Sequence, residues 1–124
     1  MPKIDISKLE TRIGSPNYPA AFKPACAGRH KTALGNAVGL SQFGVSLTKL
    51  EPGAGIPAHV HEDLEQTFVL EGSLVDHEGE CTAGNFVIRA KGSRHAPTAP
   101  NGCTMLVFFL KPTAALKKAL LKHA

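Results

Sequence analysis

Apolar residues alternate with small or polar residues along several short stretches of this chain. The clearest is FGVSLT at residues 43–48, where Phe, Val and Leu alternate with Gly, Ser and Thr. A period of two is typical of a β-strand with one buried face. Similar stretches predict strands at Ile4 to Ile6, Glu65 to Leu70, Ser73 to Val75, Asn85 to Arg89 and Thr104 to Leu110. Turns separate several of these stretches, and short strands spaced in this way predict an all-β sandwich or barrel.

The two ends of the chain differ from this strand region. Residues 1–40 contain proline-rich passages at 15–19 and 22–24, which exclude regular helix and predict an extended arm. Such an arm wraps its own barrel or crosses to a second subunit. Residues 112–124 place Ala and Leu beside three lysines at helical spacing, which predicts a short amphipathic C-terminal helix that serves as a lid or a dimer contact. Residues 41–111 are predicted to form the barrel of a single domain.

The composition fits one globular domain that is rich in turns. The chain has 124 residues, of which 43% are hydrophobic and 19% charged, with 12 Gly and 9 Pro. No apolar run approaches the roughly 20 residues of a membrane span, and the charged N-terminus lacks the apolar stretch of a signal peptide. We therefore expect a cytoplasmic protein that does not bind membranes. Three widely spaced cysteines predict buried thiols rather than a disulfide framework or a redox site.

Charge is distributed unevenly along the chain. The net charge is +4, yet the segment between Leu50 and Ile88 holds eight acidic residues and no Lys or Arg. The basic residues outside it are scattered and lack the interleaved aromatics of a nucleic-acid surface, so we expect no nucleic-acid partner. A divalent cation bound beside Glu65 would offset part of the negative charge of this segment.

Three potential metal ligands lie within this acidic block. His59 and His61 are two residues apart and therefore project from one face of an extended segment, and Glu65 keeps the same parity. A fourth candidate, His95, follows a glycine-containing corner after the strand predicted at Asn85 to Arg89. If that strand lies antiparallel to the first segment in a closed sheet, His95 can face the other three across a barrel mouth.

Three imidazoles and one carboxylate suit Mn, Fe, Co, Ni or Zn and leave coordination positions open in a six-coordinate geometry. A single His on a strand is more often a surface or core residue than a metal ligand. Four potential ligands at matching positions of the two stretches favour a metal site instead. Two roles are open for Arg89, Arg94 and Thr67. They either orient the metal ligands or contact a substrate, or they are charged residues at the barrel rim and packing residues in the barrel wall. We expect His30, His77 and His123 on the surface, and Phe68, Phe86, Phe108 and Phe109 in the core.

Two stretches of the chain resemble the paired motifs of the cupin superfamily. Gly53, His59, His61, Glu65 and Gly72 fill the first motif completely. Gly84, Gly92 and His95 fill the second, whereas Ala90 stands where proline is usual and Ala99 where asparagine is usual. A closer similarity is to the ChrR-type cupin-like domain, carried by FVLEGSLVDHEGECTAGNFV, GSRHAPTAPNGC and the strand that follows.

The resemblance implies a double-stranded β-helix, the RmlC-like cupin jelly-roll barrel, with one divalent transition metal (Fe, Mn, Ni or Zn) inside. Proteins with ChrR-type cupin-like domains include zinc-binding anti-sigma factors, and their relatives include small iron-dependent dioxygenases that cleave diketones. A dioxygenase-like enzyme acting on a small dicarbonyl or hydroxy-ketone is therefore the first hypothesis, with isomerisation or decarboxylation as other reactions. The second hypothesis is a non-catalytic sensor of a metal or small ligand, and the third is a purely structural cupin. Fold-level analogy favours a homodimer.

Overall fold

The computed structural model of the chain describes residues 3–14, 20–39 and 43–110. The helix expected at residues 112–124 lies outside these ranges. Within them, the helical segments are four short 3-10 turns: η1 (Ile6–Lys8), η2 (Ala20–Phe22), η3 (Pro24–Cys26) and η4 (Gly35–Val38). No helix in this part of the chain is long and apolar enough to cross a membrane.

Eleven strands make up the rest of the regular structure in the described ranges. They are β1 (Thr11–Ile13), β2 (Arg29–Ala33), β3 (Phe43–Leu50), β4 (Ala54–Gly55), β5 (His59–Val60), β6 (Glu65–Asp76), β7 (Gly79–Thr82), β8 (Phe86–Arg89), β9 (Arg94–His95), β10 (Thr98–Ala99) and β11 (Cys103–Leu110). The all-β prediction is therefore confirmed.

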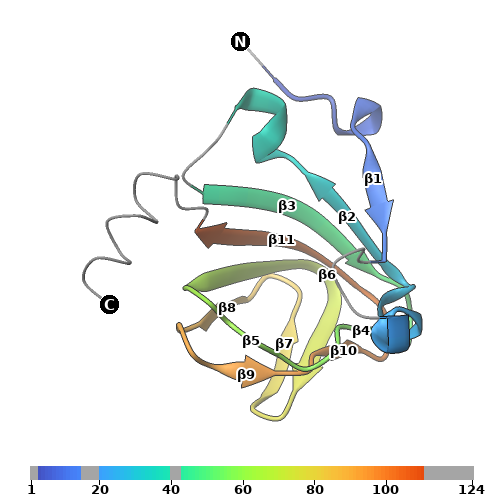
Figure 1. The fold of residues 1–124 in the computed structure, drawn as a ribbon, viewed down its shortest axis with the longest axis vertical. Helices are drawn as coiled ribbons and strands as arrows, with labels where there is room; N and C mark the ends of the chain where they lie inside the picture. The colour runs from blue at the N-terminus through green and yellow to red at the C-terminus, as the bar shows by residue number, and fades with distance from the viewer. Residues whose placement is uncertain (1–2, 15–19, 40–42, 111–124) are drawn as a thin grey trace.

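The strands form a curled antiparallel sheet that encloses an interior. The main path runs β1-β2-β3-β11-β6-β10-β4, with β7 and β8 also paired to β6, while β5 and β9 pair only with each other. Long strands β3, β11 and β6 lie side by side, and β5 and β9 run along the opposite side of the curl (Figure 1). Of the two architectures that the strand spacing allowed, the barrel is the one adopted. Strands β1 and β2 of the N-terminal region extend the sheet beyond β3.

The strand predicted at Ile4 to Ile6 is wrong. Residues 6–8 form the 3-10 turn η1, and the Asp5 carboxylate accepts hydrogen bonds from the Ser7 amide (3.1 Å) and the Ser7 hydroxyl (2.6 Å). An aspartate that caps its own following backbone competes with strand pairing, and this local bond wins over the weak apolar alternation.

Strand β6 joins two predicted strands into one of 12 residues. A β-bulge lies within it, because Val69 pairs with Met105 and Glu71 pairs with Thr104, which leaves Leu70 as the extra residue. An extra residue shifts the alternation of side chains by one position. Odd-numbered positions such as Val69 face the interior before the bulge, and even-numbered ones such as Leu74 face it afterwards.

The hydrophobic core is aliphatic and lies at one end of the barrel. It consists of Leu50, Val69, Leu74, Ala99, Cys103 and Met105. The prediction of core aromatics is wrong for Phe86, which is 48% exposed, and Phe68, Phe108 and Phe109 are only partly buried. All three cysteines are free, as expected; Cys26 and Cys103 are buried, whereas Cys81 is only partly buried.

Candidate metal centre

Strands β5 and β9 bring the two sequence motifs together. His59 pairs directly with His95 in their antiparallel register. The pairing continues past the end of β5, where the His61 amide donates to the Ser93 carbonyl (2.9 Å) and the Gly92 amide donates to the His61 carbonyl (2.8 Å). Residues two apart on an extended segment share a face, so His59 and His61 point into the same space as His95.

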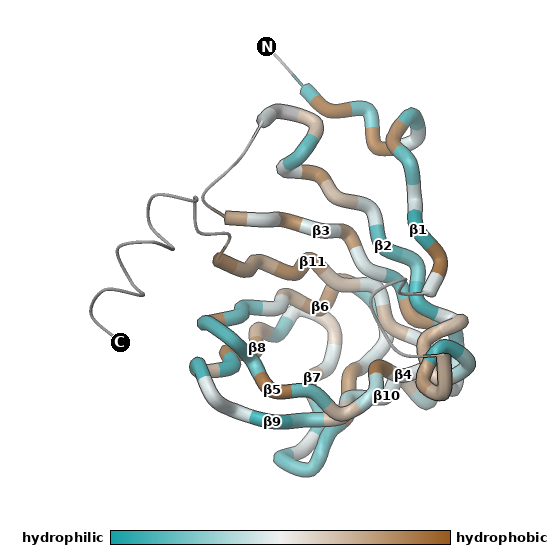
Figure 2. Tube along the Cα trace, in the orientation of Figure 1, coloured by the Kyte–Doolittle hydropathy of each residue, from teal (hydrophilic) through white to brown (hydrophobic). Residues whose placement is uncertain are grey.

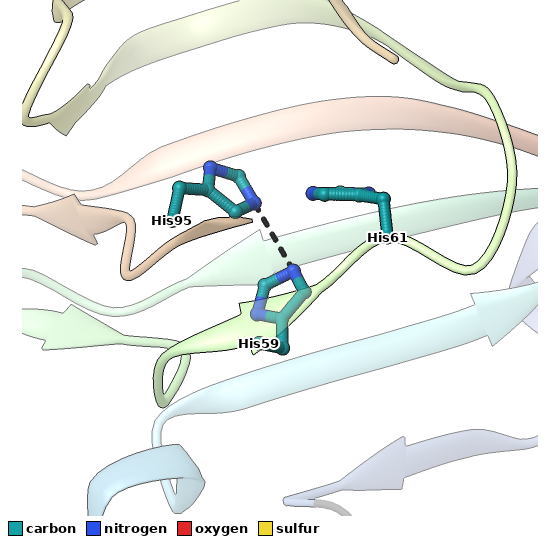
Figure 3. A group of neighbouring side chains, drawn as sticks. All are labelled: His59, His61 and His95. Atoms are coloured by element: carbon teal, nitrogen blue, oxygen red, sulfur yellow. Dashed lines mark hydrogen bonds between the residues drawn. The ribbon is translucent and has the colours of Figure 1, made fainter. Parts of the chain in front are cut away.

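The three imidazole rings face one another inside the barrel (Figure 3). Their centroids are 4.6–4.9 Å apart, and one nitrogen from each ring lies within 4.8 Å of the other two. His61 and His95 are buried and His59 is half-buried. Three of the four predicted ligands are therefore gathered at one point.

Contacts on the outer side of each ring determine which nitrogen carries the proton. His59 Nδ1 lies 2.9 Å from the Pro57 carbonyl oxygen, and His95 Nδ1 lies 3.2 Å from Asp76 Oδ2. His61 Nδ1 lies 3.5 Å from Glu65 Oε2. Carbonyl and carboxylate oxygens only accept, so the neutral rings of His59 and His95 carry their hydrogen on Nδ1, and the carboxylate that faces His61 Nδ1 favours the same tautomer there. Each Nε2 then presents a lone pair.

The dashed contact in Figure 3 joins two of the Nε2 atoms, and in the tautomers just described neither of them carries a hydrogen. His59 Nε2 and His95 Nε2 are 3.0 Å apart, which is hydrogen-bond distance for two atoms that both carry lone pairs. His61 Nε2 is buried and has no hydrogen-bond partner among the described residues. Two nitrogen ligands at right angles around a metal at about 2.1 Å are also roughly 3.0 Å apart. A cation shared by the three nitrogens removes the repulsion and satisfies the orphaned atom, so these residues fit a metal ion.

Burial keeps His61 and His95 in the neutral form that binds metal. It lowers the pKa of His95 to about 4, helped by the neighbouring His59 and His61 and opposed by the hydrogen bond to Asp76. Burial likewise lowers the pKa of His61, against the attraction of Glu65. At neutral pH both rings are therefore unprotonated on Nε2 and available to a metal.

Glu65, the fourth predicted ligand, lies beside the cluster rather than within it. Its carboxylate contacts the Nδ1 side of His61, and its side chain is 28% exposed. In this position Glu65 orients the His61 ring, in the way that outer carboxylates commonly orient histidine ligands. Its role as an oxygen ligand stays a prediction.

Asp76 was not among the site residues predicted from the sequence. The Asp76 side chain is 3% exposed and contacts both His95 and the Arg89 guanidinium, while Arg89 also reaches Glu78 at 3.0 Å. Burial works to raise the pKa of Asp76, but the Glu78 amide, His95 and Arg89 together hold it below its ordinary value. Asp76 is thus an ionised acceptor that fixes the tautomer and the orientation of His95. Arg89, already a candidate orienting group, holds Asp76 in place.

The other candidate polar residues fall in different places. Thr67 is buried on the inner face of β6. Arg94 pairs with Val60 and is exposed, on the face of β9 opposite to His95. His77 is exposed beside Glu78, His30 lies 3.8 Å from Glu51 at the surface, and His123 is outside the described ranges.

The second motif forms its corner without the usual proline. Ser93 closes the turn instead, donating from its amide (3.1 Å) and its hydroxyl (2.6 Å) to the Ala90 carbonyl oxygen. Ala99 is fully buried in the core, where its carbonyl accepts from the amides of Gly53 and Gly102. Both departures from the cupin pattern are therefore accommodated, and His95 keeps its place.

A curled antiparallel barrel with a histidine cluster built from two such motifs defines a cupin. Comparison with protein families identifies which kind, because the model of the ChrR cupin-like domain matches residues 22–113. The chain belongs to this family. Comparison with curated proteins finds no match.

Solved structures support the same assignment. A cupin from Silicibacter pomeroyi DSS-3, described as a sugar phosphate isomerase, is 38% identical with a TM-score of 0.74, covering 86% of this chain and 74% of that one. The anti-sigma factor ChrR of Rhodobacter sphaeroides, solved in complex with SigE, is 26% identical with a TM-score of 0.60, covering 66% of this chain and 44% of that one.

A candidate acetylacetone dioxygenase from Methylibium petroleiphilum PM1 is 16% identical with a TM-score of 0.68, covering 89% of this chain and 76% of that one. At this identity the likeness concerns the fold alone.

Proposed function

We propose that this chain is a metal-dependent enzyme that acts on a small hydroxy-carbonyl compound. His59, His61 and His95 hold one divalent transition metal, with Glu65 as the fourth ligand. The observation that carries the proposal is the convergence of three Nε2 lone pairs, two of them 3.0 Å apart and the third buried without a partner. A structural cupin would gain nothing from keeping such a repulsive arrangement in its interior.

The donor set indicates what the metal contributes. Imidazole nitrogens suit Fe, Mn, Ni and Zn, and when bound such an ion acts as a Lewis acid that polarises a carbonyl oxygen. The chain itself supplies orientation: the Pro57 carbonyl holds the outer nitrogen of His59, the Asp76 carboxylate holds that of His95, and Arg89 holds Asp76. The barrel wall limits access of water to His61 and His95, which are 5% and 6% exposed.

Isomerisation is the reaction best supported for this site. The 38% identical cupin is described as a sugar phosphate isomerase, and the match covers 86% of this chain. Isomerisation of a hydroxy-carbonyl compound moves hydrogen between adjacent carbons, and it is promoted by polarising the carbonyl oxygen. Oxygenative cleavage of a dicarbonyl, the first expectation from the sequence, has support only at the level of fold from the dioxygenase neighbour.

The metal is tested by elemental analysis of the purified protein. We expect about one transition-metal ion per chain in the wild type and none after His61→Ala, because that substitution removes the buried nitrogen that has no other partner. His77→Ala is the matched control, since His77 is 61% exposed and pairs with Glu78, which is also exposed. Full metal content in His61→Ala would refute the metal centre.

The reaction is tested on protein loaded in turn with Fe(II), Mn(II), Ni(II) and Zn(II). Interconversion of aldose and ketose phosphates is followed by NMR, and O2 uptake is followed with 1,3-diketones and hydroxy-ketones. We expect isomerisation without O2 uptake. Uptake with a diketone and no isomerisation would assign the dioxygenase reaction instead.

The second candidate is a sensor that reports metal or small-ligand binding to a partner protein. Its support is the 26% identity with ChrR, whose structure was solved with SigE. This chain spans 44% of the length of ChrR, so partner binding by ChrR does not transfer directly. Absence of turnover with every substrate and metal, together with metal-dependent capture of a partner, would favour the sensor. For either function the proposed location is the cytoplasm.

A further inference from the structure

Strand β2 places a lysine on the inner face of the barrel sheet, which is the face that the buried residues Thr48 and Thr67 share. Lys31 pairs with Thr48 in the register of β2 and β3, and residues paired across an antiparallel sheet share a face. The Lys31 ammonium lies 4.9 Å from the centroid of the Phe109 ring. At this distance the cation–π interaction is attractive, so Phe109 holds the positive charge over the inner face.

The Phe109 ring lies between Lys31 and the histidine cluster. Phe109 pairs with Gly44 of β3 on one side and with Glu65 of β6 on the other. Its ring lies over Gly44, where an added Cβ would overlap it, so the missing side chain of this glycine makes room for the ring. Glu65 in turn contacts His61. Two neighbouring side chains, Phe109 and Glu65, therefore connect Lys31 to the cluster.

The next row of the inner face carries hydroxyl groups. Ser46 and Thr67 pair with Val107 from its two sides, and Thr48 lies two residues from Ser46 on β3. Ser46, Thr48 and Thr67 are buried, whereas Val107 is only partly buried. Moving a hydroxyl from water into a protein interior costs free energy that an apolar side chain does not. Hydroxyls kept around a partly open position favour a ligand that bears hydroxyl groups of its own.

A second positive charge lies on the same face of β2. Arg29 pairs with the core residue Leu50, two residues before Lys31. Its Nε atom is buried and has no hydrogen-bond partner among the described residues. Figure 2 shows that β2 begins as a hydrophilic strand, whereas β11, in the middle of the same sheet, is apolar along most of its length. Positive charge on the inner face is thus concentrated on β2, where it favours an anionic ligand group.

We propose that Lys31 binds an anionic group at the end of the substrate that is distant from the metal. The substrate class is then a sugar that carries a phosphate or a carboxylate. Its carbonyl group lies at the histidine cluster, its hydroxyl groups face Ser46 and Thr67, and its anionic group contacts Lys31, with Arg29 adding positive charge. This inference rests on the proposed function, because it requires a hydroxy-carbonyl compound at the metal.

The proposal is tested on the metal-loaded full chain with ribose 5-phosphate, glucuronate and ribose as probes. Titration calorimetry gives their dissociation constants, and turnover gives KM and kcat. Lys31→Met keeps an apolar stem and removes the charge. We expect it to weaken binding of the preferred anionic probe about tenfold or more, with kcat nearly unchanged and ribose unaffected. Lys31→Arg should retain much of the binding, because it keeps the charge.

Lys49→Met is the matched control, since Lys49 is exposed on the opposite face of the same sheet and its loss should leave all three probes unaffected. Lys31→Gln gives the same test if Lys31→Met does not fold.

The outcomes separate this proposal from the proposed function. Tighter binding of ribose 5-phosphate or glucuronate than of ribose, lost in Lys31→Met, supports the anion site even without turnover, and the tighter probe identifies the anionic group. In that case the enzyme proposal alone fails. Turnover with the same KM in wild type and Lys31→Met would overturn the anion site and leave the enzyme in place. A wild-type protein that binds neither anionic probe more tightly than ribose would overturn the anion site as well.

Discussion

His95 Nδ1 lies 3.2 Å from Asp76 Oδ2, and this contact ties one half of the histidine cluster to the longest strand of the sheet. Asp76 ends β6, whose first residue, Glu65, lies 3.5 Å from His61 Nδ1. One strand therefore orients two of the three rings, from its opposite ends. The contributions of Asp76 and Glu65 to metal binding can therefore be measured by replacing these carboxylates while the three histidines stay in place.

Replacing Asp76 should weaken metal binding without abolishing it. Asp76→Asn leaves an oxygen that can accept from His95 Nδ1 but removes the charge that pairs with Arg89. We expect metal affinity to fall about 10–100-fold, the range usual for outer partners of histidine ligands. Competition with a coloured chelator measures the change. The control is Glu78→Gln, because Glu78 also pairs with Arg89 but is 60% exposed and does not contact His95. An Asp76 variant with wild-type affinity would contradict the orienting role.

Replacing Glu65 distinguishes an oxygen ligand from an orienting group. If Glu65 binds the metal, Glu65→Gln should lower affinity by more than about 100-fold, beyond the range of outer partners. If it acts only through His61 Nδ1, the Gln oxygen still accepts that proton and the loss stays small. We expect the larger loss, measured by the same chelator competition. Glu62→Gln is the control, since Glu62 is exposed and has even parity, unlike Glu65.

Acid should destabilise the metal-free protein over a defined pH window. The folded pKa of His95 is about 4, below its ordinary value of 6.5. Between these values the unfolded chain binds a proton at this residue and the folded chain does not, so the free energy of unfolding falls as pH decreases from about 6.5 to 4. The shift corresponds to roughly 3 kcal/mol at most, and the lowered pKa of His61 acts in the same direction.

Urea unfolding of chelator-treated protein at several pH values between 7.5 and 4 measures this effect. His95→Gln should flatten the dependence, whereas His77→Gln should leave it unchanged because His77 is 61% exposed. Stability that stays constant or rises on acidification would show that the buried rings do not titrate as described.

Local alternation was enough to predict β3, β6, β8 and β11 and to place His59 and His61 on one face, because both depend on residues close in sequence. It failed for Asp76. Counting by twos from Glu65 puts Asp76 on the outer face, and only the extra residue Leu70 in β6 turns it inward. A bulge depends on the pairing partner β11, which lies far away in sequence, so no local pattern reveals it.

Alternation in β3 had a different limit. It separated Phe43, Val45 and Leu47 from the residues between them, but it could not say which set faces the interior. Burying the apolar set is the usual outcome for an isolated barrel. In the structure Ser46 and Thr48 are buried inside the barrel, whereas Phe43 is 40% exposed on the outer face. Which set faces inward depends on the packing of the whole sheet, not on the strand itself.

The glycine that ends the first motif should be the least replaceable of the motif glycines. Gly72 has φ 73°, and a Cβ added there would lie 2.0 Å from the Gly102 carbonyl oxygen. Gly53 has a similar φ of 81° but nothing within 4 Å of an added Cβ. Gly53→Ala should therefore cost only the backbone strain, about 1–2 kcal/mol. Gly72→Ala should cost clearly more in urea unfolding, since the clash is with backbone that cannot move aside without disturbing β11. Equal losses for the two variants would mean that backbone strain alone explains why glycine stands at both positions.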